Sequence, residues 1–245
     1  MTQQILTITE NVPVTKTVYR MTLTGEGLEE QKPGGFVNIR LDGLFLRRPI
    51  SVYDSEPGRL VILYKVVGRG TEQMAGLRPG ETLDVLTGLG NGYDLSKAGD
   101  RPLLLGGGVG VPPLYLLSKQ LIAAGKTVHA VLGFNTADEV FGEEEFKALG
   151  CGVTVTTADG SRGVKGFAAH AMEGLDYSYV YTCGPELMLK SVYDAASTSG
   201  QFSFEERMGC GFGACMGCSC KTITGYKRIC REGPVLEKEE IIWED

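Results

Sequence analysis

The sequence predicts a protein of mixed class, in which an antiparallel β-barrel is followed by a parallel-sheet α/β domain and a cysteine-rich tail. Three observations support this fold class. Residues 1–99 contain strands in which apolar and polar side chains alternate, and residues 100–202 contain buried strands that alternate with helices. Residues 203–245 hold five of the seven cysteines of the chain. We therefore expect three units with these boundaries.

The predicted barrel rests on strands that bury one face. In residues 18–25, apolar side chains occupy every second position and polar ones lie between them, which is the period-two pattern of a half-buried strand. The pattern recurs at 36–41, 59–67 and 81–89, and turns that contain proline and glycine separate these segments. No long amphipathic helix is predicted in this part of the chain. Several short antiparallel strands without helices favour a closed barrel.

The predicted α/β domain begins where the pattern changes at about residue 100. Short apolar runs bounded by glycine indicate buried strands, and helical patterns follow each of them. Such alternation requires a parallel sheet with right-handed crossover connections. Strands are expected within 101–110, 127–134, 152–160 and 177–185, and helices within 112–124, 138–150, 167–172 and 186–197.

Composition excludes two classes of partner. The formal net charge of −6, without any long basic run, argues against binding to nucleic acid, whose phosphates require clustered lysine and arginine. No apolar run approaches the ~18 residues of a membrane span, so we expect no membrane partner. Residues 1–10 show no basic region followed by an apolar one, which predicts no signal peptide and a cytoplasmic location.

Four cysteines near the C-terminus follow the spacing C-x4-C-x2-C-x11-C, and we predict that they ligate a [2Fe-2S] cluster. The first three positions have the spacing of plant-type ferredoxins, in which a tight loop wraps three thiolates around the cluster. Glycines between them allow the backbone to bend and to bring N–H groups close to the sulfur atoms. The predicted ligands are Cys210, Cys215, Cys218 and Cys230.

A structural zinc site is the main alternative for these thiols, and free thiols are another. Zinc sites with four thiolates usually combine two short C-x2–4-C motifs, and no second such motif lies near Cys230. Cys220 is a fifth thiol in the same stretch, which we expect to be a buried and inert residue. Cys151 is expected to be a core or loop residue.

Two loops at the ends of buried strands predict a nucleotide site. Residues 103–114, "LLLGGGVGVPPL", join a strand to a helix, where absent side chains let the backbone approach a pyrophosphate. The loop is no Walker A motif, and Pro113 stands where the common dinucleotide fingerprint has glycine or alanine, so a plain tight turn is the alternative. Residues 182–186, "TCGPE", make a second such junction at the carboxyl edge of the same sheet, where open α/β sheets bind ligands.

The motifs at 47–53 ("RRPISVY"), 68–71 ("GRGT"), 106–113 and 182–186, in this order, resemble those of the ferredoxin–NADP reductase superfamily. That superfamily joins a flavin-binding β-barrel to a pyridine-nucleotide domain. With "CGFGACMGCSC" at 210–220, the chain looks most like the family of electron-transfer subunits of the heteromeric dihydroorotate dehydrogenase B. The resemblance covers essentially the whole chain, and it implies FAD, NAD and a [2Fe-2S] cluster as cofactors.

The resemblance also implies which residues bind FAD. Arg48 would pair with the FAD pyrophosphate, because a planar guanidinium suits phosphate oxygens. Ile50 stands where many relatives have an aromatic residue, and Ser51 would reach the region of flavin N5. The alternative for this stretch is a surface turn before a strand. The implied FAD residues are Arg48, Pro49, Ile50, Ser51, Leu63, Tyr64, Lys65, Gly70 and Thr71, and the implied nucleotide residues are Gly106, Gly108, Gly110, Pro113, Cys183, Gly184 and Pro185.

NADH is expected rather than NADPH. The stretch 127–146 contains no lysine or arginine that could bind a 2′-phosphate, whereas Asp138 and Glu139 would repel one. Arg162 in the next loop is a modest counter-argument. We predict no acid–base catalytic residue, because the work of such a chain is to position cofactors and tune their potentials.

By resemblance, the partner is an FMN-containing dihydroorotate dehydrogenase catalytic subunit, in a heterotetramer with two copies of each subunit. Electrons would pass from the partner's FMN through the cluster and FAD to NAD⁺ in de novo pyrimidine (UMP) biosynthesis. One alternative is the diaphorase subunit of another NAD(P)H-dependent iron–sulfur enzyme, of the sulfhydrogenase or ferredoxin–NADP reductase type. A second alternative is a zinc-stabilised nucleotide-binding regulator without enzymatic activity.

Overall fold

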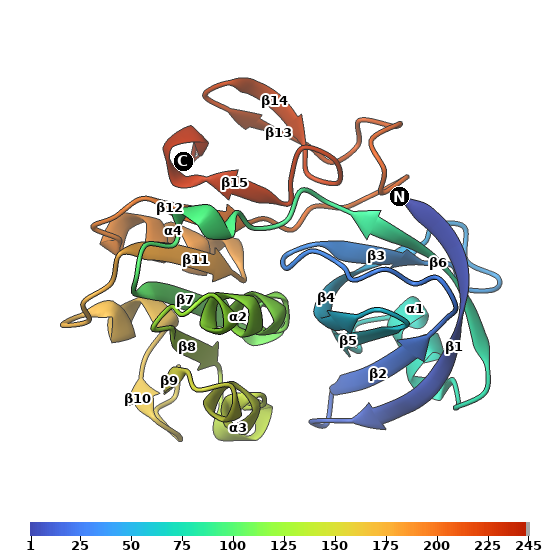
Figure 1. Ribbon diagram of the computed structural model, residues 1–245, viewed down its shortest axis with the longest axis horizontal. Helices are drawn as coiled ribbons and strands as arrows, with labels where there is room; N and C mark the ends of the chain where they lie inside the picture. Colours follow the sequence, from blue (N-terminus) through green and yellow to red (C-terminus); the bar gives the residue numbers. More distant parts are fainter. Residues whose placement is uncertain (244–245) are drawn as a thin grey trace.

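The computed structural model describes residues 1–243, and it contains a closed barrel, a seven-stranded sheet and a two-stranded hairpin. Figure 1 shows the barrel and the sheet side by side, with the hairpin above their junction. This arrangement confirms the predicted fold class. No helix within residues 1–243 is both long and apolar enough to cross a bilayer.

The barrel is antiparallel throughout, with the strand order β1-β2-β5-β4-β3-β6. Strand β1 has mostly exposed positions, which explains why its sequence shows no clean alternation. The short helix α1 was not predicted either. The elements are β1 (Thr2–Pro13), β2 (Val18–Thr24), β3 (Phe36–Ile39), β4 (Arg48–Glu56), β5 (Arg59–Lys65), α1 (Arg69–Gly76) and β6 (Thr82–Leu89).

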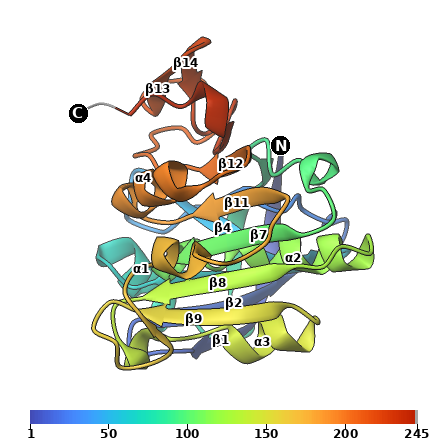
Figure 2. The same cartoon turned by 90° about the vertical axis from the view of Figure 1, so that its left-hand side faces the viewer.

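The sheet has the order β10-β9-β8-β7-β11-β12-β15, and all its neighbouring strands are parallel except β12 and β15. Figure 2 shows its long strands stacked one above another. Its strands are β7 (Pro102–Gly107), β8 (His129–Phe134), β9 (Gly152–Thr157), β10 (Val164–Lys165), β11 (Tyr179–Cys183), β12 (Gly200–Ser203) and β15 (Val235–Glu237).

Helices cover both faces of this sheet. Helices α2 (Pro113–Ala123) and α3 (Glu143–Ala148) lie on the side that faces the barrel, and α4 (Glu186–Ala195) lies on the other side (Figure 1). The predicted helix 138–150 is broken, because Gly142 adopts a left-handed backbone with φ of 81°. The predicted helix 167–172 is a 3₁₀ helix, Ala168–Met172.

The barrel and the sheet domain share an apolar cluster, which is separate from the core inside the barrel. In β5, Leu60, Ile62 and Tyr64 belong to the core of the barrel, whereas Val61 and Leu63 belong to the core of the sheet domain. Successive side chains of a strand point to opposite faces, so one strand serves both cores. The two parts are therefore packed directly against each other.

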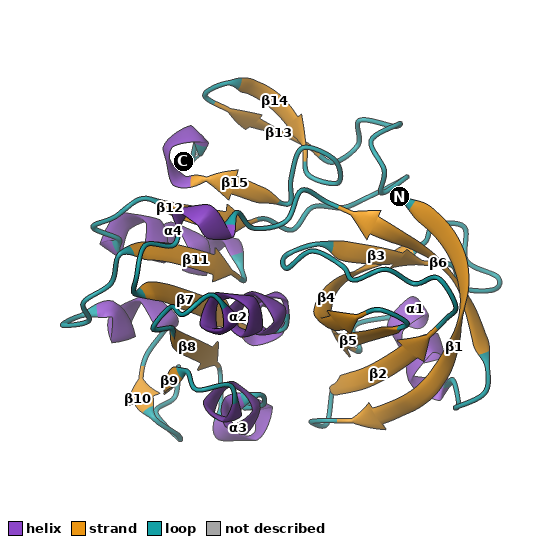
Figure 3. Cartoon of the chain, in the orientation of Figure 1, coloured by secondary structure: helices purple, strands orange, loops and turns teal. Residues whose placement is uncertain are grey.

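Residues 204–218 form an irregular segment that returns from the sheet toward the barrel. Figure 3 shows this segment as loop before the hairpin of β13 (Ser219–Thr222) and β14 (Gly225–Arg228). Asn91, just after β6, donates through Nδ2 to the carbonyl oxygens of Glu232 and Val235 at 3.0 and 2.7 Å. The tail is thus fastened to the barrel as well as to the sheet.

Candidate cofactor sites

The larger cavity, of about 570 Å³, lies at the carboxyl ends of β7, β8 and β11. This is the edge where open parallel sheets bind ligands. Its wall combines the glycine loop, the 184–188 turn and residues of the β8 end. Among the predicted nucleotide residues, Gly108, Gly110, Gly184 and Pro185 line it.

The glycines of the loop have different physical roles. A Cβ atom at Gly110 would lie 2.2 Å from the carbonyl oxygen of Cys183, and one at Gly106 would lie 2.8 Å from the Cα of Val111. These two positions therefore need glycine so that the loops can pack together. A Cβ at Gly108 would meet nothing within 4 Å, although its φ of 53° favours glycine. Pro113 begins α2, where its missing N–H costs nothing.

The smaller cavity, of about 370 Å³, lies between β4, β5 and the segment after β12. It collects most of the residues that the resemblance assigned to FAD. Cys183 also lines this cavity rather than the larger one. The predicted residues found in its wall are Arg48, Pro49, Ile50, Ser51, Leu63, Tyr64, Lys65 and Thr71.

Gly70 does not line the smaller cavity but makes room for a residue that does. A Cβ atom there would lie 2.2 Å from Nε of Arg48 and 3.0 Å from its Cζ. The hydroxyl of Thr71 accepts a hydrogen bond from the Val67 backbone N–H at 2.8 Å, which fixes the turn that enters α1. The "GRGT" stretch therefore forms a close-fitting support for the Arg48 guanidinium.

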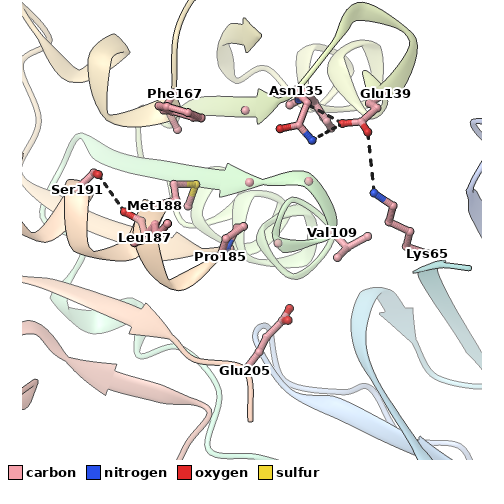
Figure 4. A pocket seen from close by; sticks show the side chains of 17 residues that line it. Lys65, Val109, Asn135, Glu139, Phe167, Pro185, Leu187, Met188, Ser191 and Glu205 are labelled. Atoms are coloured by element: carbon pink, nitrogen blue, oxygen red, sulfur yellow. Dashed lines mark hydrogen bonds and ion pairs between the residues drawn. The ribbon is translucent and has the colours of Figure 1, made fainter. Parts of the chain in front are cut away.

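Three residues line both cavities, so the cavities adjoin: Lys65, Val109 and Glu205. Figure 4 shows them around the open space between the sheet domain and the barrel. Glu205 is exposed to the cavities. The protein atoms around its carboxyl group still displace part of the water, and this desolvation raises the pKa of the group. Sequence reasoning missed Val109, which lies inside the 106–113 motif, and Glu205, which lies two residues after the end of β12.

An ion pair crosses the larger cavity from one domain to the other. Lys65 Nζ lies 3.9 Å from Glu139 Oε1, as the dashed line in Figure 4 marks. Asn135 holds the same carboxylate through its backbone N–H at 3.2 Å and its Nδ2 at 2.9 Å. Asp138 does not line the cavity and instead pairs with Lys16 at 3.4 Å. Of the two acids that the sequence singled out, only Glu139 is placed to meet a ligand.

The four predicted metal ligands form two neighbouring pairs. The backbone N–H of Cys210 points to the Cys215 sulfur, with N and Sγ 3.5 Å apart, and the N–H of Cys230 points to the Cys218 sulfur at 3.4 Å. Within residues 1–243, no three His, Cys, Asp or Glu side chains are arranged to hold one metal ion. A [2Fe-2S] cluster has two metal positions, each with two protein ligands, and two thiol pairs fit that requirement.

Local electrostatics favour thiolate at the first cysteine. Burial raises the pKa of the Cys210 thiol, but backbone N–H groups of Phe212, Ala214 and Cys215 outweigh this and bring the pKa down to about 6. Thiolate is the form that binds metal. Cys220 lies on β13 outside both pairs and is only partly buried, not buried as predicted; partial desolvation raises the pKa of its thiol.

Comparisons with known proteins agree with this architecture. A family model described as the iron-sulfur cluster binding domain of dihydroorotate dehydrogenase B matches residues 205–242. The chain is 40% identical, over 99% of both chains, to the dihydroorotate dehydrogenase B (NAD(+)), electron transfer subunit of Geobacillus sp. (strain WCH70). It is 44% identical to the subunit of the same name from Fusobacterium nucleatum, over 96% of both chains.

Solved structures show the same fold. The NADH-dependent reduced ferredoxin-NADP oxidoreductase, studied for flavin-based electron bifurcation, superimposes with a TM-score of 0.90 and 31% identity, over 98% of this chain and 90% of that one. Phthalate dioxygenase reductase superimposes with a TM-score of 0.69 and 18% identity, over 90% of this chain and 87% of that one. Given the near-complete coverage by the curated relatives, the chain belongs to the family of dihydroorotate dehydrogenase B (NAD(+)) electron transfer subunits.

Proposed function

We propose that the chain passes electrons from an FMN-containing dihydroorotate dehydrogenase catalytic subunit to NAD⁺, through a [2Fe-2S] cluster and FAD, in UMP biosynthesis. The observation that carries this proposal is the shared wall of Lys65, Val109 and Glu205, which brings the contents of the two cavities together. A bound flavin can exchange a hydride with a nicotinamide and single electrons with an iron–sulfur cluster. The family membership supports the same role.

We assign the smaller cavity to FAD. Arg48 would hold the pyrophosphate as a charge-assisted hydrogen-bond donor, with Gly70 and Thr71 supporting it from α1. Ser51 and Leu63 lie in the walls of the same cavity, and Cys183 closes it from the sheet domain. Burial raises the pKa of the Cys183 thiol to about 12, so this side chain is a neutral packing group and not a nucleophile.

We assign the larger cavity to NAD. The backbone of the glycine loop and the first turn of α2 would bind the pyrophosphate. Glu139, fixed by Asn135, would repel the 2′-phosphate of NADP.

The two thiol pairs differ in exposure, which suits a relay between an interior and a surface. Cys218 and Cys230 are 3% and 2% exposed, whereas Cys215 is exposed and Cys210 is intermediate. We infer that the cluster is held by segment 203–245, FAD by 1–99 and NAD by 100–202, and that the catalytic subunit docks near Cys215 in a heterotetramer. A cytoplasmic location fits this assignment, because a reducing compartment keeps such thiols free for the cluster.

A coupled assay tests the proposal. The purified chain would be mixed with an FMN-containing dihydroorotate dehydrogenase subunit, and dihydroorotate-dependent reduction of NAD⁺ would be followed at the absorbance of NADH. We expect reduction only when both proteins are present. A chain that contains FAD and a cluster but gives no coupling would contradict the proposal.

A second candidate follows from the 0.90 TM-score and 31% identity to the bifurcating ferredoxin–NADP oxidoreductase. The chain would then serve as the flavin subunit of another NAD(P)H-dependent iron–sulfur enzyme. The same preparation distinguishes the two, because this candidate predicts reduction of ferredoxin by NADH with a different partner and no response to dihydroorotate.

A further inference from the structure

Asn38 is a polar residue where the fold offers an apolar environment. It lies in β3, is 1% exposed, and has the buried apolar residues Val37 and Ile39 on either side. Val37 and Ile39 point into the core of the barrel, so Asn38 and Phe36 point to the opposite face. Phe36 packs there in the same apolar cluster as Cys218 and Cys230. Asn38 therefore faces the cysteine-rich segment.

The amide of Asn38 contacts the first predicted cluster ligand. Its Nδ2 donates to the carbonyl oxygen of Cys210 at 3.2 Å, across 172 residues of sequence. Its Oδ1 is buried and has no hydrogen-bond partner among residues 1–243. A buried amide with an unpaired oxygen costs free energy that an apolar residue would not. The hydrogen bond from Nδ2 to Cys210 is therefore the polar contact of this side chain that can offset the cost.

The absence of a side chain at Gly211 leaves space for this amide. A Cβ atom at Gly211 would lie 2.2 Å from Nδ2 of Asn38, and its φ of 77° also favours glycine. The backbone of Asn38 is also held in place, because Nη1 of Arg47 donates a hydrogen bond to its carbonyl oxygen at 3.3 Å. Arg47 in turn makes two 2.9 Å bonds to the carboxylate of Asp84 on β6.

The same residue adjoins the flavin motif. Asn38 pairs across the ladder with Pro49, Ile39 pairs with Arg48, and Phe36 pairs with Ser51. One short strand therefore touches the cysteine loop through a side chain and the strand of the flavin motif through its backbone. Among the described residues, no other side chain of β3 forms a hydrogen bond to the segment 205–218.

We propose that Asn38 is a positioning residue that sets the place of the [2Fe-2S] cluster relative to the FAD, by holding Cys210 against β3. This inference rests on the proposed function. Electron transfer between two fixed centres weakens steeply with their separation, so a loosened Cys210 would slow the step between flavin and cluster. The step between NADH and flavin does not involve Cys210 and would be unaffected.

The test uses the full chain with both cofactors bound and compares Asn38→Leu and Asn38→Asp with the unchanged protein. Leucine removes the donor, and aspartate keeps the shape but replaces the donor with an acceptor facing the Cys210 oxygen. Rapid mixing with NADH would follow the flavin and the cluster by their separate absorbances. We expect flavin bleaching at the unchanged rate and cluster reduction slowed about tenfold, as for other residues that orient metal ligands.

The spectroscopic readout is the electron paramagnetic resonance signal and the reduction potential of the cluster, both of which should shift in the two variants. Gln31→Leu is the matched control, because Gln31 is also a buried amide of the barrel but bonds to Glu29 and Gly88, away from the cysteines. Unchanged cluster kinetics, signal and potential in both Asn38 variants would overturn the inference. Equal changes in Gln31→Leu would overturn it too, because the effect would then be general destabilisation.

The same experiment separates this inference from the proposed function. If NADH reduced neither centre in the unchanged protein, the proposed function would fail. If NADH reduced both centres there and the Asn38 variants behaved identically, only the role of Asn38 would fail.

Discussion

At the scale of single residues, Arg48 and Gly70 depend on each other. The guanidinium of Arg48 occupies the space that any side chain at position 70 would need, since the Cβ would approach its Nε to 2.2 Å. Gly70 is buried in the first turn of α1 and has an ordinary helical environment, so the backbone alone does not demand glycine. Glycine is needed at position 70 because the Arg48 side chain lies against it, and Arg48 in turn lines the smaller cavity.

We expect Gly70→Ala to weaken FAD binding about tenfold, because overpacking of this kind costs about 1–3 kcal/mol and displaces Arg48. Flavin fluorescence titration of the flavin-depleted chain would measure the affinity. Gly76→Ala is the control, since a Cβ there meets nothing within 4 Å. If Gly70→Ala and Gly76→Ala bound FAD with equal affinity, FAD binding would not depend on the present position of Arg48.

At the scale of elements, the segment between β12 and β13 has little regular structure of its own. It is held instead by groups from elsewhere: Arg228 of β14 donates to the Gly213 carbonyl at 2.5 Å and pairs with Glu232. Backbone N–H groups inside the loop point at sulfur, as in the 3.2 Å contact of Ala214 N to Cys210 Sγ. These contacts keep the thiols of the loop close together, as ligation of a two-iron cluster requires.

We expect Cys210→Ser to lower the iron and acid-labile sulfide content about tenfold or more while FAD remains bound, because serine lacks the thiolate that iron requires. Iron analysis and the visible spectrum after subtraction of flavin would measure this. Cys220→Ser, on the adjoining strand β13, is the matched control and should keep the full content. Loss of iron and acid-labile sulfide from the Cys220→Ser protein would show that this fifth thiol is a ligand and that the assignment of the pairs is wrong.

At the scale of the whole molecule, the barrel and the sheet domain are joined by specific contacts as well as by their common core. Tyr53 of β4 stacks on Tyr115 of α2, with ring centroids 4.3 Å apart and planes 14° apart. Arg20 of β2 pairs with Glu145 of α3 at 2.8 Å. These contacts fix the distance between the two cavities, whose shared wall comes from both domains.

We expect Tyr115→Leu to slow reduction of FAD by NADH about tenfold, because loss of the stack lets the cavities shift and hydride transfer is sensitive to small displacements. Stopped-flow absorbance of the flavin would measure the rate at saturating NADH. Tyr193→Leu removes a different aromatic contact, with Phe202 and Trp243, on the far side of the sheet. If both variants slowed the reaction alike, the interface would have no special role.

The sequence by itself determined the two-part fold and most of the cavity walls. Period-two alternation, strand–helix alternation and glycine at strand ends are local signals, because each arises from the geometry of a few neighbouring residues. The motif residues from Arg48 to Pro185 lie at or beside the cavities for this reason. The spacing of the cysteines likewise predicted that four thiols lie close together, because they are near one another in the chain.

Tertiary structure alone decided which distant residues meet. Nothing in the neighbourhood of Asn38 or Glu205 in the chain marks them, because Asn38 meets Cys210 only across 172 residues, and Glu205 joins two cavities only once the segment after β12 lies against the barrel. The choice between Asp138 and Glu139 was also made by the fold, which turns one carboxylate to Lys16 and the other into the cavity. Contacts between remote segments depend on how whole elements pack, and no local pattern contains that information.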